Sequence, residues 1–241
     1  MRMLTRGFYR LVVRLLLLCL AAPIAMAGDF WVKKPYQNWS AEETQQMLGD
    51  SPWAKTVTLA GLTNAASAPL ENSAGVEMES NPGITYTLQF RSAQPIREAQ
   101  VRSSQLSSHY DKMSAEQKAT FDANMTKFLA VTFPDRVVVS VTFHTDVQNY
   151  ASLLRVFWAK QSLATLSLYT YLNTKDERLS LSGYVFKDDT FQFVFPRPKQ
   201  LRPDDKISVE FVQPRIAAIG EQRIFQEFNV KKMVVNGVPS F

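Results

Sequence analysis

The residue pair best suited to chemistry is His144 and Asp146, two positions apart at the end of an alternating apolar run. A histidine titrates near neutral pH, and a neighbouring carboxylate can orient it as a base or join it in binding a metal ion. The same spacing is also typical of a histidine at a strand end, followed by an aspartate that caps a helix. The second interpretation is the commoner one, so the pair is a candidate binding site and not a predicted catalytic centre.

Two further pairs of acidic residues, Asp188 with Asp189 and Asp204 with Asp205, could offer oxygen ligands to calcium. Neither pair has the spaced ligands and closing glutamate of an EF-hand, and both lie in segments typical of turns. The chain has only two histidines and none of the motifs of zinc proteases, serine hydrolases, P-loop proteins or dinucleotide-binding proteins. The sequence therefore predicts no cofactor and no metal, names no catalytic residue and favours a protein that is not an enzyme.

The segment 28–55 holds most of the tryptophans of the chain: Trp31, Trp39 and Trp53. Within it, Ser40 and Glu43 have the spacing of a capping box and predict the start of a short helix, which Gly49 is expected to end in a left-handed conformation. A helix of this length is unstable alone, so the tryptophans are expected to anchor it in the core of a larger body. The alternative is an aromatic platform for a sugar or a protein partner, which makes these three tryptophans candidate binding residues.

The first 27 residues have the three parts of a secretory signal peptide. A basic region precedes the apolar run 15–24, and Ala25, Met26 and Ala27 form a small-residue cleavage site. The apolar run is about half as long as a membrane-spanning helix requires. We expect cleavage after Ala27 and export to the periplasm or the cell exterior, without a transmembrane helix in the mature chain. Lipidation of Cys19 is the less favoured alternative, since Leu18 precedes it.

Removal of this segment changes the charge of the chain. It takes away four arginines and no acidic residue, which leaves 23 basic and 22 acidic side chains and a net charge of +1. A nearly neutral chain gives no reason to expect nucleic acid or anionic lipid as a partner. Cys19 is the only cysteine, so the mature protein has no internal disulfide and must be stabilised by its core. The residues that remain after cleavage are enough to form such a core in a single domain.

The spacing of apolar residues predicts an α+β fold. Alternation over 84–90 and 136–144 indicates two strands, joined by a helical hairpin near 95–130 whose second helix begins at a capping box formed by Ser114 and Gln117. A further helix is expected near 147–162, although this segment is apolar enough to form a strand. Beyond it, alternation predicts strands at 164–172, 179–186, 190–195, 207–212 and 224–235. Tight polar turns between them favour an antiparallel-rich sheet or sandwich of about seven strands.

Composition divides the mature chain into three parts. The tryptophan-rich helical segment covers 28–62 and includes a short possible strand at 55–59. The residues at 63–83 are small, polar and rich in turn formers, as in a linker or mobile loop. The α+β domain is expected to cover 84–241.

Aromatic, basic and small residues form a pattern at the start of the mature chain: Phe30, Trp31, Lys33, Lys34, Pro35, Tyr36, Trp39, Ser40, Glu43, Leu48, Ser51, Pro52, Trp53 and Ala54. This pattern resembles a group of uncharacterised secreted proteins of acidobacterial type. The similarity continues loosely over 193–197 and 228–237 and is specific mainly at the tryptophans. The group has no known activity. The resemblance implies a diderm bacterial host and a location in the cell envelope, and it supplies no catalytic residues.

Two classes of function follow. The first is an exported, non-catalytic envelope protein that binds a protein partner or a glycan, and it is favoured by the aromatic segment, the signal peptide and the lack of catalytic motifs. The second is an enzyme or a small-ligand-binding protein whose site is assembled around His144 and Asp146.

Overall fold

The computed structural model describes residues 30–60, 83–202, 204–217 and 219–241. The expected signal peptide, and all of the expected linker except Gly83, lie outside these residues. Helix α2 (Phe30–Lys33) belongs to a unit that ends at Lys34. A second unit, called the body below, runs from Pro35 to Phe241, so that its compact part begins well before residue 84.

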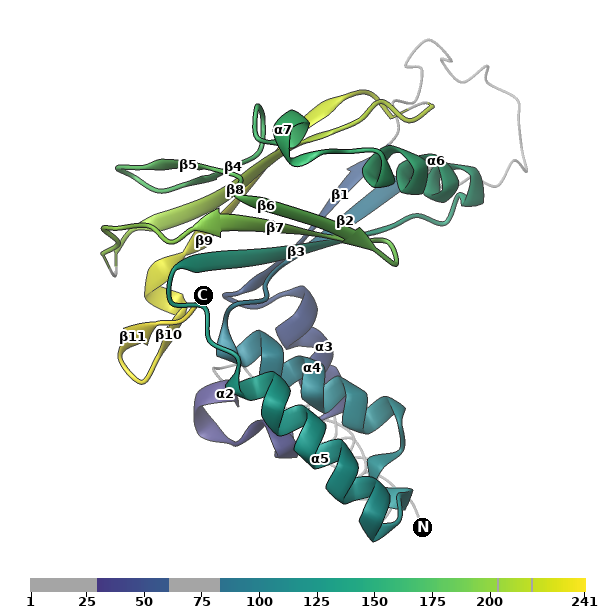
Figure 1. Ribbon diagram of the computed structural model, residues 1–241, viewed down its shortest axis with the longest axis vertical. Coiled ribbons are helices and arrows are strands. Elements are labelled where there is room, and N and C mark those ends of the chain that lie inside the picture. Colours follow the sequence, from purple (N-terminus) through teal and green to yellow (C-terminus); the bar gives the residue numbers. More distant parts are fainter. Residues whose placement is uncertain (1–29, 61–82, 203, 218) are drawn as a thin grey trace, which may run out of the picture. The chain divides into compact units, whose positions relative to one another are not determined.

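The body contains two antiparallel sheets (Figure 1). The first has five strands, in the spatial order β1 (Ala54–Ala60), β2 (Gly83–Phe90), β3 (Arg136–His144), β7 (Thr190–Pro196) and β6 (Gly183–Lys187). The second has four, in the order β5 (Arg178–Ser180), β4 (Tyr171–Asn173), β8 (Lys206–Gln213) and β9 (Gln222–Asn229). With the helices between the early strands, this arrangement confirms the predicted α+β class.

The core lies between the two sheets. Along β2 every second residue is buried, and along β7 the three phenylalanines are fully buried, as the alternating sequence predicts. Phe191 and Phe193 meet Phe211 of β8, whose ring centroid lies 5.8 Å and 5.7 Å from theirs and 5.5 Å from that of Tyr86. Two apolar sheet faces thus remove each other from water, which is the main stabilisation of a sandwich.

The expected helical hairpin is present between β2 and β3, as α4 (Gln94–Ser107) and α5 (Ala115–Ala130). Ser114 and Gln117 form the predicted capping box at the start of α5. At the other end of α5, Nη1 of the buried Arg97 donates hydrogen bonds to the carbonyl groups of Leu129 (3.0 Å) and Val131. This cation satisfies helix-terminal carbonyls that have no partner within α5 and so fastens α5 to α4.

The segment near 147–162 is a helix, α6 (Gln148–Ala159), as its spacing indicated. Trp158 of α6 is fully buried, and its ring stacks at 4.0 Å on Phe191 between the sheets. The expectation that Asp146 caps this helix is wrong. The N-cap is Val147, whose N–H is bound by Thr145 Oγ1 at 3.3 Å, while the carboxylate of Asp146 turns to His144.

Three strand predictions near the C-terminus are corrected. The segment 164–172 contains helix α7 (Leu163–Leu166) before β4, because Ser162 Oγ accepts the Thr165 N–H and starts a helix. The segment 179–186 divides between β5 and β6, which belong to different sheets. The segment 224–235 divides into β9, the 3-10 turn η3 (Val230–Lys232) and β10 (Val234–Val235), which pairs with β11 (Val238–Pro239). Alternation alone does not show where a chain changes sheets.

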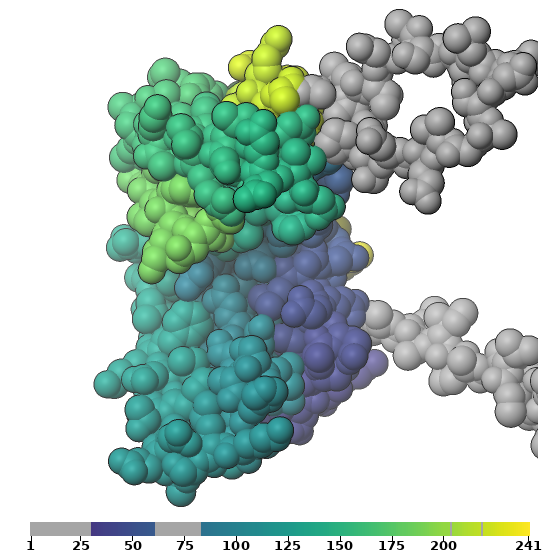
Figure 2. Space-filling model, turned by 90° about the vertical axis from the view of Figure 1, so that its right-hand side faces the viewer, coloured from purple at the N-terminus to yellow at the C-terminus, as the bar shows by residue number. Residues whose placement is uncertain are grey.

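The predicted short helix after Ser40 is α3 (Ala41–Gly49), and Ser40 and Glu43 form its capping box. Gly49 is not left-handed as expected: it is the last helical residue, and Ser51 Oγ ends α3 by donating to the Met47 carbonyl at 2.8 Å. Figure 2 shows the purple-to-blue surface of α3 and β1 beside the blue-green surface of α4 and α5. Within the described part of the chain, no helix is both long and apolar enough to span a membrane.

Candidate functional site

The three tryptophans that were candidate binding residues belong to two different units of the chain. Trp39 and Trp53 lie in the body and are 1% and 0% exposed. Neither ring has a face open to a ligand, and both serve as the core anchors that the sequence suggested for the short helix. Trp31 is half-buried in α2, where its ring lies edge-on to that of Phe30 at 5.1 Å. Trp39 and Trp53 therefore form no aromatic platform on the surface of the body.

The same segment does place other side chains on the surface. Between Pro35 and Trp39 the chain forms the 3-10 turn η1 (Tyr36–Asn38), closed by the Trp39 N–H, which donates to the Tyr36 carbonyl at 3.1 Å. The Trp39 carbonyl accepts a hydrogen bond from Arg102 Nε of α4 at 2.8 Å. Because Trp39 is buried and hydrogen-bonded to α4, η1 is fixed beside α4. Its residues Tyr36 and Gln37 therefore face the helical hairpin.

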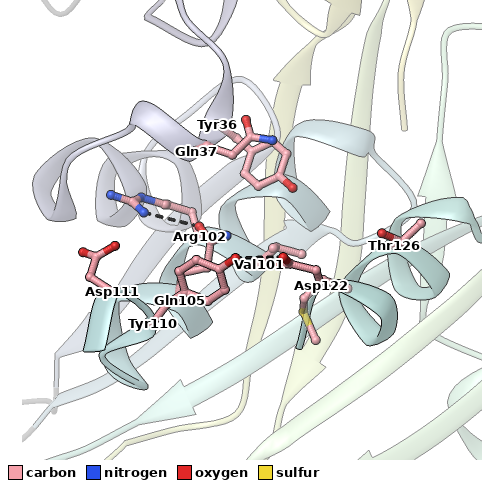
Figure 3. A pocket seen from close by; sticks show the side chains of 10 residues that line it. Tyr36, Gln37, Val101, Arg102, Gln105, Tyr110, Asp111, Asp122 and Thr126 are labelled. Atoms are coloured by element: carbon pink, nitrogen blue, oxygen red, sulfur yellow. Dashed lines mark hydrogen bonds between the residues drawn. The ribbon is translucent and has the colours of Figure 1, made fainter. Parts of the chain in front are cut away.

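A cavity of about 430 Å³ lies where η1 meets the helical hairpin. Figure 3 shows Tyr36 and Gln37 on one side of it and Arg102, Gln105, Tyr110 and Asp122 on the other. The remaining lining comes from Val101, Asp111, Met125 and Thr126. We call this space the Tyr36–Tyr110 cavity. Its volume is within the range of sites that hold small ligands.

The polar groups of the Tyr36–Tyr110 cavity hold one another in place. The Tyr110 hydroxyl donates to Asp122 Oδ2 across the hairpin at 2.8 Å, and Arg102 Nη1 donates to Gln105 Oε1 at 3.3 Å. Tyr110 reaches Asp122 because His109 adopts a left-handed conformation, with φ of 51°, and reverses the chain after α4. Tyr110 then begins the 3-10 turn η2 (Tyr110–Lys112). His109, one of the two histidines of the chain, thus has a conformational role.

Substitution of His109 tests this role. A left-handed backbone suits glycine and strongly disfavours a β-branched residue. We expect His109→Gly to preserve the free energy of unfolding within about 1 kcal/mol and His109→Val to lower it by about 1–2 kcal/mol, as measured by urea denaturation. Equal stability of the two variants would show that the turn does not require the left-handed conformation.

Both tyrosines of the cavity remain protonated phenols over the physiological pH range. Burial, followed by the nearby charges of Glu98 and Asp122, raises the pKa of Tyr36. The hydrogen bond that Tyr110 donates to Asp122 raises the pKa of Tyr110. A phenol in this state can donate one hydrogen bond and accept others.

The Tyr36–Tyr110 cavity thus combines two phenol rings with carboxylate, amide, guanidinium and hydroxyl groups. Sugars have the complementary chemistry, because each ring carries hydroxyl groups that donate and accept hydrogen bonds and an apolar face of C–H groups that packs on aromatic rings. Sequence reasoning did not identify this cavity. Tyr36 follows the expected cleavage site closely, but its partners come from a helical hairpin more than sixty residues later in the chain.

The other candidate pair is brought together but left in solvent. His144 Nε2 lies 3.2 Å from Asp146 Oδ1, and the two side chains are 76% and 98% exposed. They border a cavity of about 370 Å³, where Arg155 donates two hydrogen bonds to Asp189. These hydrogen bonds lower the pKa of Asp189, which stays ionised. The exposed histidine and aspartate are surrounded by water, which screens the electrostatic effect of one on the other.

We predict that the double variant His144→Ala/Asp146→Ala has the same melting midpoint as the wild type, because an exposed pair contributes little to stability. It should also bind the ligands of the wild type with unchanged affinity. Differential scanning fluorimetry with and without ligand checks both expectations. Loss of ligand binding in this variant would support a site assembled around this pair.

The acidic pairs take part in turns. Asp188 and Asp189 are both left-handed, with φ of 49° and 59°, and form the two-residue connection of the β6–β7 hairpin. Asp205 is buried, and its carboxylate accepts the Arg202 N–H at 2.7 Å. Over the residues that the structure describes, no three histidine, cysteine or acidic side chains come together as metal ligands would.

Comparisons with known proteins place this chain in no group. No protein family, no curated protein and no solved structure matches it.

Proposed function

We propose that the protein is an exported, non-catalytic glycan-binding protein of the cell envelope, and that the Tyr36–Tyr110 cavity holds the glycan. One observation carries the proposal: η1 and the α4–α5 hairpin gather two phenols, an arginine, two carboxylates and amide groups around a space large enough for a sugar ring. The signal-like N-terminal segment supports the exported address.

The fixed orientation of the cavity groups supports binding. Arg102 is held by the Trp39 carbonyl and by Gln105, and Asp122 is held by Tyr110, so these side chains lose little freedom when a ligand arrives. Preorganised polar groups of this kind give affinity and orientation to a ligand with many hydroxyl groups. Four side chains of the proposed site are therefore already held in place before a ligand binds: Arg102, Gln105, Tyr110 and Asp122.

Thermal melts of the protein, measured in the presence of each member of a panel of neutral oligosaccharides, test the proposal. A ligand that binds only the folded state raises the melting midpoint. At a hundredfold excess over its dissociation constant, it raises the free energy of unfolding by about 2.7 kcal/mol. We expect at least one neutral glycan to raise the midpoint. A cooperative melt that no glycan moves would contradict the proposal.

A protein partner is the second candidate, because four large apolar side chains of α6, α7 and the segment after it are exposed. The exposed members are Leu153 (42%), Val156 (53%), Leu163 (41%) and Leu168 (71%). Contiguous exposed apolar side chains are typical of protein contact surfaces, and these four are close together in the sequence. If this surface binds an envelope protein, Val156→Asp/Leu168→Asp should abolish its co-purification, while changes in the Tyr36–Tyr110 cavity should not.

A further inference from the structure

Figure 1 shows the strands of the four-stranded sheet. Its outer face carries one buried carboxylate between two exposed guanidinium groups. On this face Glu210 of β8 lies opposite Tyr171 of β4 on one side and Phe225 of β9 on the other. The side chain of Glu210 is 7% exposed, whereas those of Arg178 and Arg223 are 54% and 61% exposed. The two arginines therefore cover the glutamate and face the solvent themselves.

The two guanidinium groups converge on a single oxygen atom. Arg178 Nη2 of β5 donates to Glu210 Oε1 at 3.4 Å, and Arg223 Nη1 of β9 donates to the same oxygen. The other oxygen, Oε2, accepts a hydrogen bond from Asn173 Nδ2 at 3.1 Å. Among the described residues, Glu210 is the one carboxylate that pairs with either arginine. Two positive charges thus share one negative charge, and the group keeps a net charge of +1.

The Tyr171 ring fixes the orientation of the Arg178 side chain. Its Cζ lies 3.7 Å from the centroid of the Tyr171 ring, and the Tyr171 hydroxyl is held by the Leu168 carbonyl at 2.6 Å. A guanidinium group has five N–H donors, and Arg178 and Arg223 each commit one to Glu210. The exposed guanidinium groups therefore present further donors to the solvent, in a geometry that pairs well with carboxylate and phosphate oxygens.

A cavity of about 420 Å³ adjoins this group on the same face. Asn173, Ser208 and Phe225 are among its lining residues, and the Phe225 side chain offers an apolar surface because the residue is 59% exposed. Two lysines and three acidic residues also border it: Lys175, Asp204, Asp205, Lys206 and Glu227. Lys206 pairs with Glu227 at 2.6 Å, and the Asp205 carboxylate accepts the Arg202 N–H. Cationic donors, hydrogen-bonding groups and an open aromatic ring are therefore adjacent on one sheet face.

We propose that this face is a second binding site, which takes an anionic group, a carboxylate or a phosphate, between Arg178 and Arg223. The body of the ligand lies over Phe225 in the adjoining cavity. Glu210 holds the arginines together but leaves one charge for the ligand to neutralise. The site is formed by strands of the second sheet and not by the helices of the Tyr36–Tyr110 cavity, so it does not depend on the glycan proposal.

Isothermal titration of the protein with three probes tests this site. Trigalacturonate carries carboxylates on sugar rings, its fully methyl-esterified form has the same rings without the charges, and inorganic phosphate carries the charge alone. We expect trigalacturonate to bind at least tenfold more tightly than the ester. Binding of phosphate in addition, or in its place, supports the anion site and points to a phosphate-bearing ligand. Equal binding of trigalacturonate and its ester, or binding of neither trigalacturonate nor phosphate, would overturn the proposal.

A triple variant, Arg178→Gln/Glu210→Gln/Arg223→Gln, locates the binding. It removes all three charges together, so that no buried charge is left without a partner and the fold is preserved. We expect the affinity for the charged probe to fall at least tenfold. The matched control, Arg155→Gln/Lys187→Gln/Asp189→Asn, changes the net charge of the protein equally, where Arg155 of α6 pairs with the β6–β7 turn. An equal loss of affinity in the control would show nonspecific electrostatic attraction and overturn the assignment.

Discussion

The double variant Tyr36→Ala/Asp122→Ala is expected to lose glycan binding while the protein remains folded. Tyr36 supplies a phenol ring and a donor to the Tyr36–Tyr110 cavity, and Asp122 supplies the carboxylate that also orients Tyr110. A hydrogen bond to a charged group contributes about 1.5–3 kcal/mol. Loss of one such bond and of ring contact should therefore weaken binding by roughly 10- to 100-fold or more. Titration of the variant with the glycan found by thermal melting measures this change.

A matched change away from the cavity provides the control. Tyr169→Ala/Asp176→Ala also removes one partly buried tyrosine and one exposed aspartate, but neither residue borders the Tyr36–Tyr110 cavity. Its dissociation constant should equal that of the wild type, and the melting midpoints of both variants should stay close to the wild-type value. If the control and the cavity variant lose affinity equally, the glycan binds elsewhere.

Trp53→Ala is expected to cause the largest loss of stability of any single change considered. Trp53 is fully buried, and its Nε1 donates a hydrogen bond to the Ser240 carbonyl at 2.5 Å. The substitution leaves a large cavity and removes the bond that joins the chain before β1 to the C-terminal segment. Truncation of a buried tryptophan lowers the free energy of unfolding by about 3–5 kcal/mol. Urea denaturation of the variant gives this difference.

Trp53→Phe separates the contribution of the buried ring from that of the hydrogen bond to Ser240. Phenylalanine keeps most of the apolar surface but cannot donate to the Ser240 carbonyl, so the loss should be smaller, about 1–3 kcal/mol. Leu168→Ala, at a residue that is 71% exposed, should leave stability almost unchanged. A Trp53→Ala protein as stable as the Leu168→Ala protein would mean that Trp53 does not anchor the body.

The parts of the fold that the sequence predicted are those set by local patterns. Alternation located β2 and β3, and capping boxes located the starts of α3 and α5. The failures occurred where a longer-range contact or a side-chain bond decides the outcome. Ser51 ends α3 in place of a left-handed Gly49, and the strands β5 and β6 enter different sheets within a few residues. Neither the end of α3 nor the change of sheet between β5 and β6 can be predicted from the spacing of apolar residues.

The candidate sites were harder to predict, because they are assembled across the chain. The sequence drew attention to the tryptophans, and the structure shows that burial of Trp39 positions the neighbouring Tyr36 at the cavity. The sequence also placed His144 and Asp146 together, and they are together, but in solvent. Glu210 gave no signal at all, since an alternating strand predicts a polar residue at that position whether or not cations gather around it.

The most direct test of the glycan proposal is to map the bound glycan by NMR chemical-shift perturbation. For a neutral oligosaccharide that raises the melting midpoint, the amides that shift should belong to η1, to the second half of α4, to η2 and to the facing turns of α5. Shifts confined to the sheets or to α6 and α7, with η1 and the helical hairpin unchanged, would contradict the assignment of the Tyr36–Tyr110 cavity as the glycan site.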